Sequence, residues 1–449
     1  MRVADVAIVG GGAAGIAAAR DLAARGLEVV VLEARERLGG RIETLRRRDD
    51  VVPVELGAEF IHGTPKETMR VVDAGRLLAV RVPDLQELRT RRGLEERDFW
   101  RSVARVLSRV PRSGRDVSAA EFLRSKRARA AGRLGTLVRF FVEGYHAAAL
   151  DDVSARSIAM EREEQATGRA QFRVLDGQDR IIEWLRSGPG AGAVDWRKGS
   201  PVTRIEWSAP AGVTLTDARG ANVRAAAALV TVPVGVLNAG EGARGAIRFE
   251  PELPPAKRRA LACLGMGGVV KIVFRFDAPF WERDGFMARL RRRPGREGGF
   301  VFLHAPGAPF PTWWTCAPAR SALLTAWAGG PAADRLRAGK APPAEIALST
   351  LAGLLAIPRR ALAARVVSAD SHDWSSDPYA RGAYSHVLPG GAGAPRALGR
   401  PVEGRLFFAG EATSSEETGT VGGAIASGRR AAREIVAALR SGRRRKAKG

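Results

Sequence analysis

The chain has 449 residues, of which 45% are hydrophobic and 27% are charged, and its formal net charge at pH 7 is +24. A chain of this length and composition can bury a large core, and no apolar run approaches the roughly 20 residues that span a bilayer, so we expect a folded cytoplasmic protein. The two cysteines, Cys263 and Cys316, are too few for a disulfide framework and form no CxxC pair, so a metal site is not indicated.

The positive charge invites a nucleic-acid or membrane interpretation, because clusters of Lys and Arg bind polyanions. Only eight of the 72 basic residues are lysine, however, and the arginines are spread along the whole chain. Short clusters occur at 291–296 and in the tail at 442–449, which we expect to be disordered and solvated. Nucleic-acid binding is therefore not expected, although the basic surface leaves it open.

The amino end predicts a β-α-β unit that binds a dinucleotide. Residues 4–35 form a short apolar strand, a glycine loop, an alanine-rich helix and a second strand. Gly10, Gly12 and Gly15 fit G-x-G-x-x-G, in which the glycines permit the tight turn, the approach of a pyrophosphate, and the packing of helix on strand. Glu33 follows at the end of the second strand, where a carboxylate can bind ribose hydroxyls.

The next segments carry a specific resemblance. Gly39 and Gly40 bring the backbone close to a ligand, and Arg41 offers a fork-shaped cation suited to phosphate. "LEARERLGGRIET" at 32–44 and "ELGAEFIHG" at 55–63 resemble the FAD-binding start of the flavin amine oxidase family, which includes monoamine, polyamine and L-amino-acid oxidases and histone-lysine demethylases.

Two side chains of the second segment are candidates for the amine site. His62 matches a position from which polyamine oxidases present His or Glu to the substrate, and a neutral imidazole there would orient the amine or accept its proton. A purely structural histidine is the alternative. Glu59 either supplies negative charge for a cation or contacts FAD.

The middle of the chain resembles the family's return to the FAD domain at "PVTRIEW" (201–207), with Val202 near the adenine, and at "ALVTVPVGVLN" (228–238). The stretch 65–195 is expected to be mostly helical. We therefore predict an α/β fold with a Rossmann-like FAD domain assembled from discontinuous segments, and an α+β substrate domain with a mixed sheet and a helical insertion. The expected boundaries are 1–64, 196–240 and 392–449 for the FAD domain, and 65–195 and 241–391 for the substrate domain.

A lysine interrupts the apolar run "GGVVKIVFRF" at 267–276. In a strand, Lys271 and Arg275 share one face while Ile272 and Phe274 share the other, so the two cations could simply be solvated. The resemblance implies instead that Lys271 is the family's lysine, which holds a water against flavin N5. Its face of the strand would then point into a cleft.

Aromatic residues of "HDWSSDPYARGAYSHVLPGG", 372–391, resemble the walls of that cleft. Tyr384 matches one of two tyrosines that face each other before the flavin in monoamine oxidases, whereas Thr420 occupies the place of the other. Trp374 is the second expected wall, and ordinary core aromatics are the alternative for both. Ala383 replaces the cysteine that attaches flavin covalently in monoamine oxidases, so we expect non-covalent FAD.

The carboxyl end, 405–439, predicts a strand, a loop with Glu411, and a helix whose glycine-rich start can meet a ligand. In the resembled family this loop binds the ribityl chain and the helix start faces the flavin ring. The resemblance thus implies catalytic roles for Lys271, Tyr384 and His62. It implies FAD contacts for Gly10, Gly12, Gly15, Glu33, Arg35, Gly40, Arg41, Gly57, Ala58, Glu59, Val202, Trp374, Gly410, Glu411, Gly419, Thr420 and Val421.

The implied reaction is oxidation of the carbon next to an amine nitrogen, which gives an imine while O2 is reduced to hydrogen peroxide. The substrate would be a monoamine or a polyamine. An L-amino-acid oxidase or a related flavin desaturase is the alternative, and a flavoprotein that binds a polyanion without oxidising amines is a further one.

Overall fold

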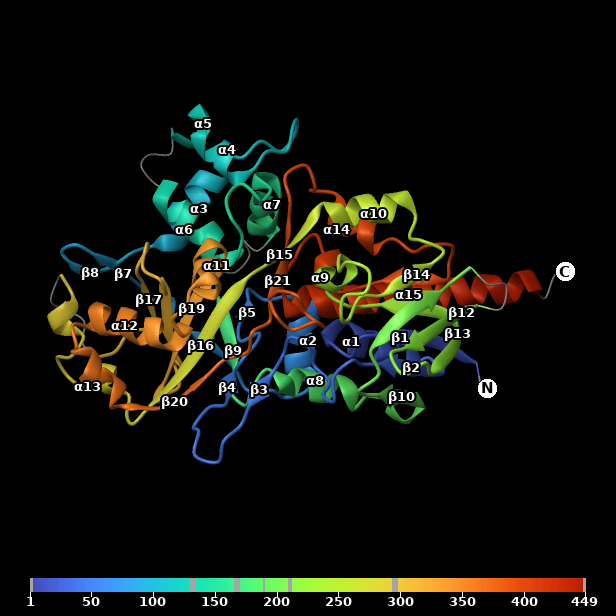
Figure 1. The fold of residues 1–449 in the computed structure, drawn as a ribbon, viewed down its shortest axis with the longest axis horizontal. Helices are drawn as coiled ribbons and strands as arrows, with labels where there is room; N and C mark the ends of the chain where they lie inside the picture. Colours follow the sequence, from blue (N-terminus) through green and yellow to red (C-terminus); the bar gives the residue numbers. More distant parts are fainter. Residues whose placement is uncertain are drawn as a thin grey trace.

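The computed structural model describes residues 3–129, 135–164, 170–188, 190–208, 212–292 and 298–446. Figure 1 shows two sheets side by side along the long axis of the molecule, each with its own helices. We call the part around the eight-stranded sheet, which lies next to both chain ends, the first lobe. The part around the seven-stranded sheet is the second lobe.

The first lobe is built on a sheet in the order β10-β2-β1-β13-β12-β11-β14, with β22 paired to β13. Pairing is parallel except that β12 runs antiparallel to both β11 and β13. Its strands are β1 (Ala4–Val9), β2 (Val29–Leu32), β10 (Val194–Arg197), β11 (Val202–Glu206), β12 (Val213–Asp217), β13 (Asn222–Val230), β14 (Arg248–Glu250) and β22 (Leu406–Phe408). The sheet thus joins strands from both ends and the middle of the sequence.

Helices cover both faces of this sheet, which explains why β2 is the uninterrupted apolar run VVVL. Val6 and Ile8 of β1 pack with α1 (Ala13–Ala23) and α15 (Val421–Lys446), while Ala7 and Val9 face the opposite core. That opposite core includes apolar residues of α10 (Pro255–Ala262) and α14 (Ala394–Gly399).

The second lobe is built on a mixed sheet in the order β20-β16-β19-β18-β17-β7-β8, antiparallel except between β17 and β7. Its strands are β7 (Gln86–Thr90), β8 (Gly93–Glu96), β16 (Val269–Phe276), β17 (Phe302–His304), β18 (Thr312–Thr315), β19 (Leu323–Gly329) and β20 (Val366–Asp370). Ile272, Phe274 and Phe276 of β16 face an apolar core shared with helices that follow β19. These helices are α11 (Pro331–Ala338), α12 (Pro343–Leu355) and α13 (Arg359–Ala363).

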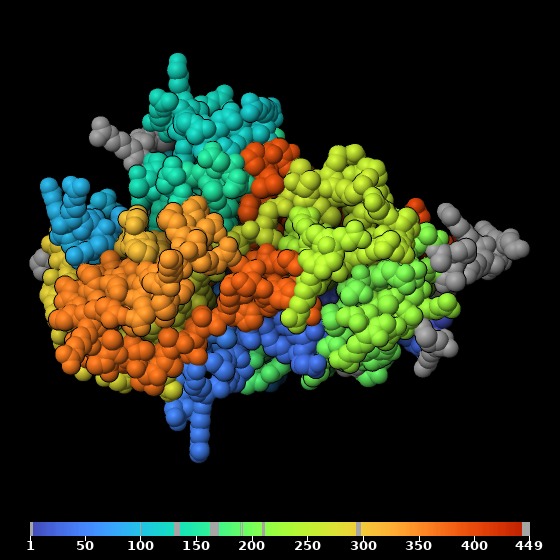
Figure 2. All heavy atoms as spheres, in the orientation of Figure 1, coloured from blue at the N-terminus to red at the C-terminus, as the bar shows by residue number. Residues whose placement is uncertain are grey.

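A group of short helices stands above the second lobe, where Figure 2 shows it as a separate prominence. It comprises α3 (Phe99–Leu107), α4 (Ala119–Arg124), α5 (Lys126–Arg129), α6 (Gly135–Tyr145) and α7 (Ala155–Glu164). Three small sheets lie at the junction of the lobes (Figure 1): β3 (Thr44–Leu45) with β4 (Val54–Glu55), β15 (Leu264–Gly267) with β21 (Tyr384–Val387), and β5 (Ile61–His62) with β9 (Gln171–Val174) and β6 (Ala79–Val82). The remaining α-helices are α2 (Lys66–Ala74), α8 (Asp179–Arg186) and α9 (Val234–Leu237).

The predicted fold class is confirmed: a Rossmann-like lobe built from discontinuous segments adjoins a lobe with a mixed sheet and a helical insertion. One local expectation is wrong: α15 continues to Lys446, so most of the basic tail is helical, and residues 447–449 lie outside the described part. Among the regular elements of 65–195 helices predominate, as expected, but strands β6 to β9 and the start of β10 also lie there.

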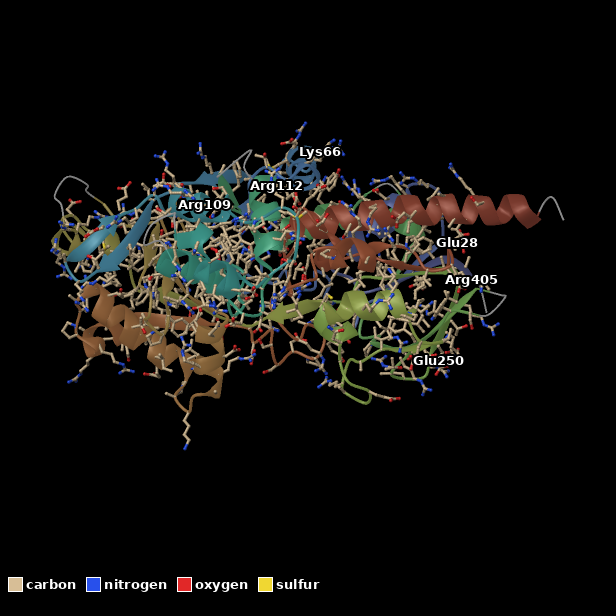
Figure 3. The ribbon with its side chains drawn as sticks, turned by 90° about the horizontal axis from the view of Figure 1, so that it is seen from above. Glu28, Lys66, Arg109, Arg112, Glu250 and Arg405 are labelled. Carbon is tan, nitrogen blue, oxygen red and sulfur yellow. The ribbon has the colours of Figure 1, made fainter. Side chains whose placement is uncertain are left out.

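Charged side chains lie on both lobes and on the helical insertion. In Figure 3, Arg109 and Arg112 lie on the helical insertion, and Glu28, Glu250 and Arg405 lie on the first lobe. None of the helices in the described part of the chain combines the length and the apolar character that crossing a bilayer demands.

Candidate active site

A long cavity runs from the glycine loop of the first lobe to the sheet of the second. With one exception, Gly15, every residue predicted from the sequence to bind FAD or to act in catalysis lines it. These lining residues are Gly10, Gly12, Glu33, Arg35, Gly40, Arg41, Gly57, Ala58, Glu59, His62, Val202, Lys271, Trp374, Tyr384, Gly410, Glu411, Gly419, Thr420 and Val421. The structure thus brings together segments that are hundreds of residues apart in the chain.

The nucleotide end of the cavity has the geometry of a dinucleotide cradle. Gly10 has a φ of 105°, which only glycine adopts readily, and a Cβ on Gly15 would lie 2.0 Å from the Gly10 carbonyl oxygen. Gly15 therefore lies behind the cavity and allows α1 to pack against the loop. Glu33 accepts hydrogen bonds from the Gly11 and Arg35 backbone N–H groups at 2.7 and 2.9 Å, which orients its carboxylate at the cavity wall. These groups suit the ribose and pyrophosphate of FAD.

Arg41 connects the two ends of the chain. Its guanidinium donates to Glu411 Oε1 at 2.9 Å and to the Ala383 carbonyl at 2.8 Å. Glu411 also accepts from Ser385 Oγ at 2.5 Å and from the Gly419 N–H at 3.1 Å. Arg41, expected to offer a free cation to phosphate, is thus already paired with a buried carboxylate that positions the start of α15.

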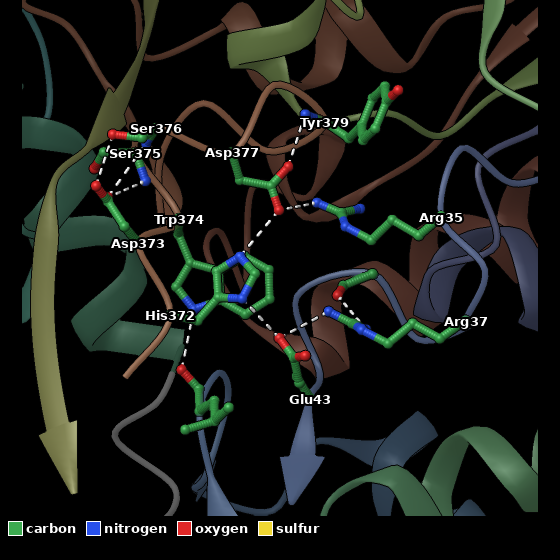
Figure 4. Close-up of polar contacts among 12 residues, drawn as sticks. Arg35, Arg37, Glu43, His372, Asp373, Trp374, Ser375, Ser376, Asp377 and Tyr379 are labelled. Carbon is green, nitrogen blue, oxygen red and sulfur yellow. Dashed lines mark hydrogen bonds and ion pairs between the residues drawn. The ribbon is translucent and has the colours of Figure 1, made fainter. Parts of the chain in front are cut away.

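Trp374 lies against a network of charged side chains, shown in Figure 4. Its indole N–H donates to the Leu56 carbonyl at 3.0 Å, and the His372 ring stacks on it with centroids 3.8 Å apart. The imidazole lies between Glu43 and Asp377, each 3.0 Å from one ring nitrogen. Hydrogen bonds to Asp377 and Glu43 raise the pKa of His372 to about 9, so the ring is an imidazolium at neutral pH.

Asp377 of this network also binds Arg35, which donates to its Oδ2 at 2.7 Å. Burial would raise the pKa of Asp377, but hydrogen bonds from His372 and Arg35 hold it well below its usual range. Arg35, expected to contact FAD, therefore lines the cavity while its charge is balanced by this carboxylate.

Lys271 is buried, with an exposed fraction of 4%, so the interpretation of a solvated strand face is wrong. Its ammonium donates to Glu59 Oε2 at 2.7 Å and to the Gly57 carbonyl at 3.1 Å. The other oxygen of Glu59 accepts from Arg173 at 2.7 Å and from the Trp314 indole N–H at 3.0 Å. Burial would raise the pKa of the Glu59 carboxyl, but Lys271 and Arg173 lower it below its usual range, so Glu59 is ionised.

Tyr384 and His62 lie near the same part of the cavity. The Tyr384 hydroxyl donates to the Tyr145 carbonyl at 2.8 Å, and burial raises the pKa of Tyr384 far above its usual range, so it stays neutral. The His62 ring meets the Tyr145 ring edge-on, with centroids 5.4 Å apart. Thr420, which stands where monoamine oxidases have their second tyrosine, lines the cavity without closing an aromatic pair.

Most of the aromatic side chains that line the cavity beyond Lys271 were not predicted from the sequence. Trp314 and Trp327 on the sheet, with centroids 5.6 Å apart, and Tyr145 and Trp100 on the helices line it together with Phe302. Arg173 was missed as well. The run TWWT in β18 was a usable signal for an aromatic strand, but nothing local marks Arg173 as the partner of Glu59.

Comparison with known proteins agrees with this geometry. The family model of flavin containing amine oxidoreductases matches residues 13–436. Polyamine oxidase 2 of Arabidopsis thaliana is 31% identical, with 96% of this chain and 88% of that protein covered, and human lysine-specific histone demethylase 2 is 28% identical, with 96% and 53% covered.

Solved structures share the fold. Putrescine oxidase bound to putrescine superimposes with a TM-score of 0.79 at 20% identity, covering 97% of this chain and 99% of that one. Cyclohexylamine oxidase from Brevibacterium oxydans gives a TM-score of 0.78 at 21% identity, covering 98% and 100%. The chain therefore belongs to the family of flavin-containing amine oxidoreductases, and its cofactor is FAD.

Proposed function

We propose that this protein is an oxidase of small amines, in which a carbon next to the amine nitrogen is oxidised to an imine and O2 is reduced to hydrogen peroxide. The observation that carries the proposal is a buried lysine, Lys271, on the wall of the cavity that also holds the dinucleotide cradle. FAD supplies the two-electron acceptor. The chain supplies position, exclusion of water and control of protons.

Contacts of the chain support the proposed role of each residue. Glu33 and the starts of α1 and α15 hold the cofactor non-covalently, because Ala383 offers no thiol. Lys271 orients a water or a proton at the reacting centre, and Tyr384 and Trp374 confine the amine between aromatic faces. A neutral amine is needed for oxidation, and the aromatic chamber favours it because charged groups lose hydration there.

The charges around the cavity favour an amine over an L-amino acid. A carboxylate-bearing substrate needs a cation to bind it. Within the described residues, the arginines that line the cavity, Arg35 and Arg41, are paired with Asp377 and Glu411. Lys271, which also lines it, is paired with Glu59. Binding an amino acid would have to compete with these buried partners. We therefore propose monoamines or polyamines as substrates.

The test is the visible flavin spectrum of the purified protein, recorded anaerobically with a polyamine, an aryl-alkyl monoamine and an L-amino acid in turn. We expect an amine to bleach the flavin, and admission of air to restore colour with formation of hydrogen peroxide. Bleaching by the amino acid alone, or by none of the three, would refute the proposal.

Lys271→Met tests the role of the lysine, and Lys257→Met is its matched control, because Lys257 is equally buried, 3% exposed against 4%, but lies outside the cavity. We expect the first variant to slow flavin turnover by about 10²-fold, within the range of proton-transfer residues, and the second to leave it unchanged. Equal rates in the two variants would remove Lys271 from the mechanism.

A further inference from the structure

Each oxygen of the Glu59 carboxylate binds a cationic side chain of the protein. Lys271 binds one oxygen at 2.7 Å, Arg173 binds the other at 2.7 Å, and all three side chains are at most 8% exposed. A buried carboxylate needs such partners, and a buried ammonium needs a carboxylate, because neither can recover its hydration. With Arg173 and Lys271 both charged, the cluster carries one net positive charge.

We propose that Glu59 is a positioning residue: its carboxylate fixes the Lys271 ammonium at the cavity wall in its charged form, and it is not the counter-ion of a cationic substrate. The inference rests on the proposed amine oxidation and adds the group that controls its lysine. It gives Glu59 a role different from the two that the sequence left open, which were to supply negative charge for a cation at the amine site and to contact FAD. The net charge also disfavours an ammonium beside Lys271, so the substrate nitrogen is received there as a neutral amine.

The hydrogen-bond partners of the Lys271 ammonium explain why a carboxylate is needed beside it. Besides Glu59, the Lys271 ammonium has a hydrogen bond to Gly57, whose carbonyl lies in the same loop. That neutral carbonyl and the Trp314 ring, whose centroid lies 5.8 Å from the ammonium nitrogen, offer the ammonium little compensation for its burial. Loss of the Glu59 charge would place two cations, Lys271 and Arg173, around one neutral side chain, and the lysine would release its proton more easily.

Other titratable groups lie near this cluster, and the experiment must distinguish their effects from that of Lys271. Burial raises the pKa of Glu55, on β4, to about 7, and burial raises the pKa of Cys316, after β18, to about 11. Both interact electrostatically with Lys271 and Glu59. A pH effect in a Glu59 variant therefore has to be traced to Lys271 by removing the lysine as well.

The experiment measures the reduction potential of FAD bound to the protein, by equilibration with a redox dye, from about pH 6 to about pH 10. It compares wild type, Glu59→Gln, Lys271→Met and the double variant. Positive charge near the flavin favours its reduced, anionic form and raises the potential. This readout needs no amine, so it decides on Glu59 even if the proposed amine oxidation fails.

The expected curves differ in shape. Glu59→Gln starts above wild type at low pH, because one negative charge is gone, and meets it at high pH, where Lys271 has lost its proton. The double variant, in which only Arg173 remains charged, runs parallel to wild type, and Lys271→Met lies below it. A Glu59→Gln curve parallel to wild type would overturn the proposal. So would an inflection that is absent from wild type, appears in Glu59→Gln and persists in the double variant, since it would belong to Glu55 or Cys316.

The kinetics of flavin reduction by an amine provide a second, independent test of the role of Glu59. If Glu59 positions Lys271, Glu59→Gln lowers the limiting rate of flavin reduction by about 10²-fold, as expected for a displaced catalytic group, with little change in amine affinity. Weaker amine binding at an unchanged limiting rate would mean that Glu59 binds the substrate cation, and would overturn the proposal.

The controls address folding. Glu87 and Arg291 form another buried ion pair in the second lobe, at 2.6 Å with side chains 4% and 6% exposed, outside the cavity. Glu87→Gln should lower the unfolding temperature but leave the potential curve of wild type intact. If Glu59→Gln alone does not fold, the double variant should fold, because it no longer holds two unbalanced cations; its failure to recover stability would contradict the charge argument.

Discussion

His372 should make the stability of the protein depend on pH in the alkaline range. The folded state raises the pKa of His372 to about 9, whereas an unfolded histidine titrates near 6.5. A raised pKa means that the folded state binds the proton more tightly than the unfolded state. The stabilisation is therefore fully present below about pH 6.5 and is lost as the pH rises through about 9.

The size of the effect follows from this difference. The difference of about 2.5 in pKa, at about 1.4 kcal/mol for each pKa unit, gives an upper limit of about 3.5 kcal/mol. The imidazole is 26% exposed and Glu43 is 24% exposed, so solvent screens part of the attraction and we expect about 2 kcal/mol. The partners do not titrate in this window, because hydrogen bonding to His372 and Arg37 lowers the pKa of Glu43 and the network likewise lowers that of Asp377.

The assay compares wild type with His372→Gln, which keeps the size of the side chain but not its charge. Urea unfolding followed by tryptophan fluorescence should show wild type more stable by about 2 kcal/mol near pH 6, with the difference vanishing near pH 10. Taking the difference cancels the groups present in both proteins. Among them is Lys257, whose pKa burial lowers to about 7, so that its contribution to stability would otherwise rise with pH. A difference that is constant with pH, or that grows on the alkaline side, would refute the assignment of an imidazolium.

Two further outcomes follow from burial and close packing. Lys257 donates hydrogen bonds to the carbonyls of Ala397, Leu398 and Arg400 at the end of α14. Lys257→Met should therefore lower the free energy of unfolding in urea by about 2 kcal/mol and leave the rate of flavin reduction unchanged. An unchanged free energy of unfolding would mean that these hydrogen bonds do not stabilise the fold. Gly15→Ala should yield protein with little bound FAD, measured from the ratio of visible to ultraviolet absorbance, because the new Cβ would meet the Gly10 carbonyl. Gly353→Ala on α12, where nothing lies within 4 Å, is the matched control, and equal FAD content in the two variants would contradict the packing argument.

Individual helices, strands and turns of this fold were predictable because the sequence patterns that specify them lie within short stretches of the chain. The β-α-β unit follows from the apolar runs around Gly10 and Gly12, and the alternation in 267–276 separates Lys271 from Ile272 and Phe274.

The partners of the predicted residues were not predictable in the same way. Lys271 and Arg275 share a strand face, yet one binds Glu59 and the other pairs with Asp50, because different segments cross the two ends of β16. Arg173 reaches Glu59 only because β9 pairs with β5, and such pairings depend on the whole tertiary arrangement. Alternation within a strand shows which side chains share a face, but it does not show what that face meets.

Segments from the beginning and the end of the sequence pack together in the first lobe, which affects how this lobe can fold while the chain is being synthesised. The central strand β1 lies between β2 and β13, and α1 packs against α15, the last helix. One edge of β1 therefore lacks its partner until β13 has been made, and one side of α1 lacks its native cover until α15, the last helix of the described residues, has been made. The cofactor site cannot exist before residues beyond 421 have emerged, so the nascent chain should depend on chaperones until its final helix docks.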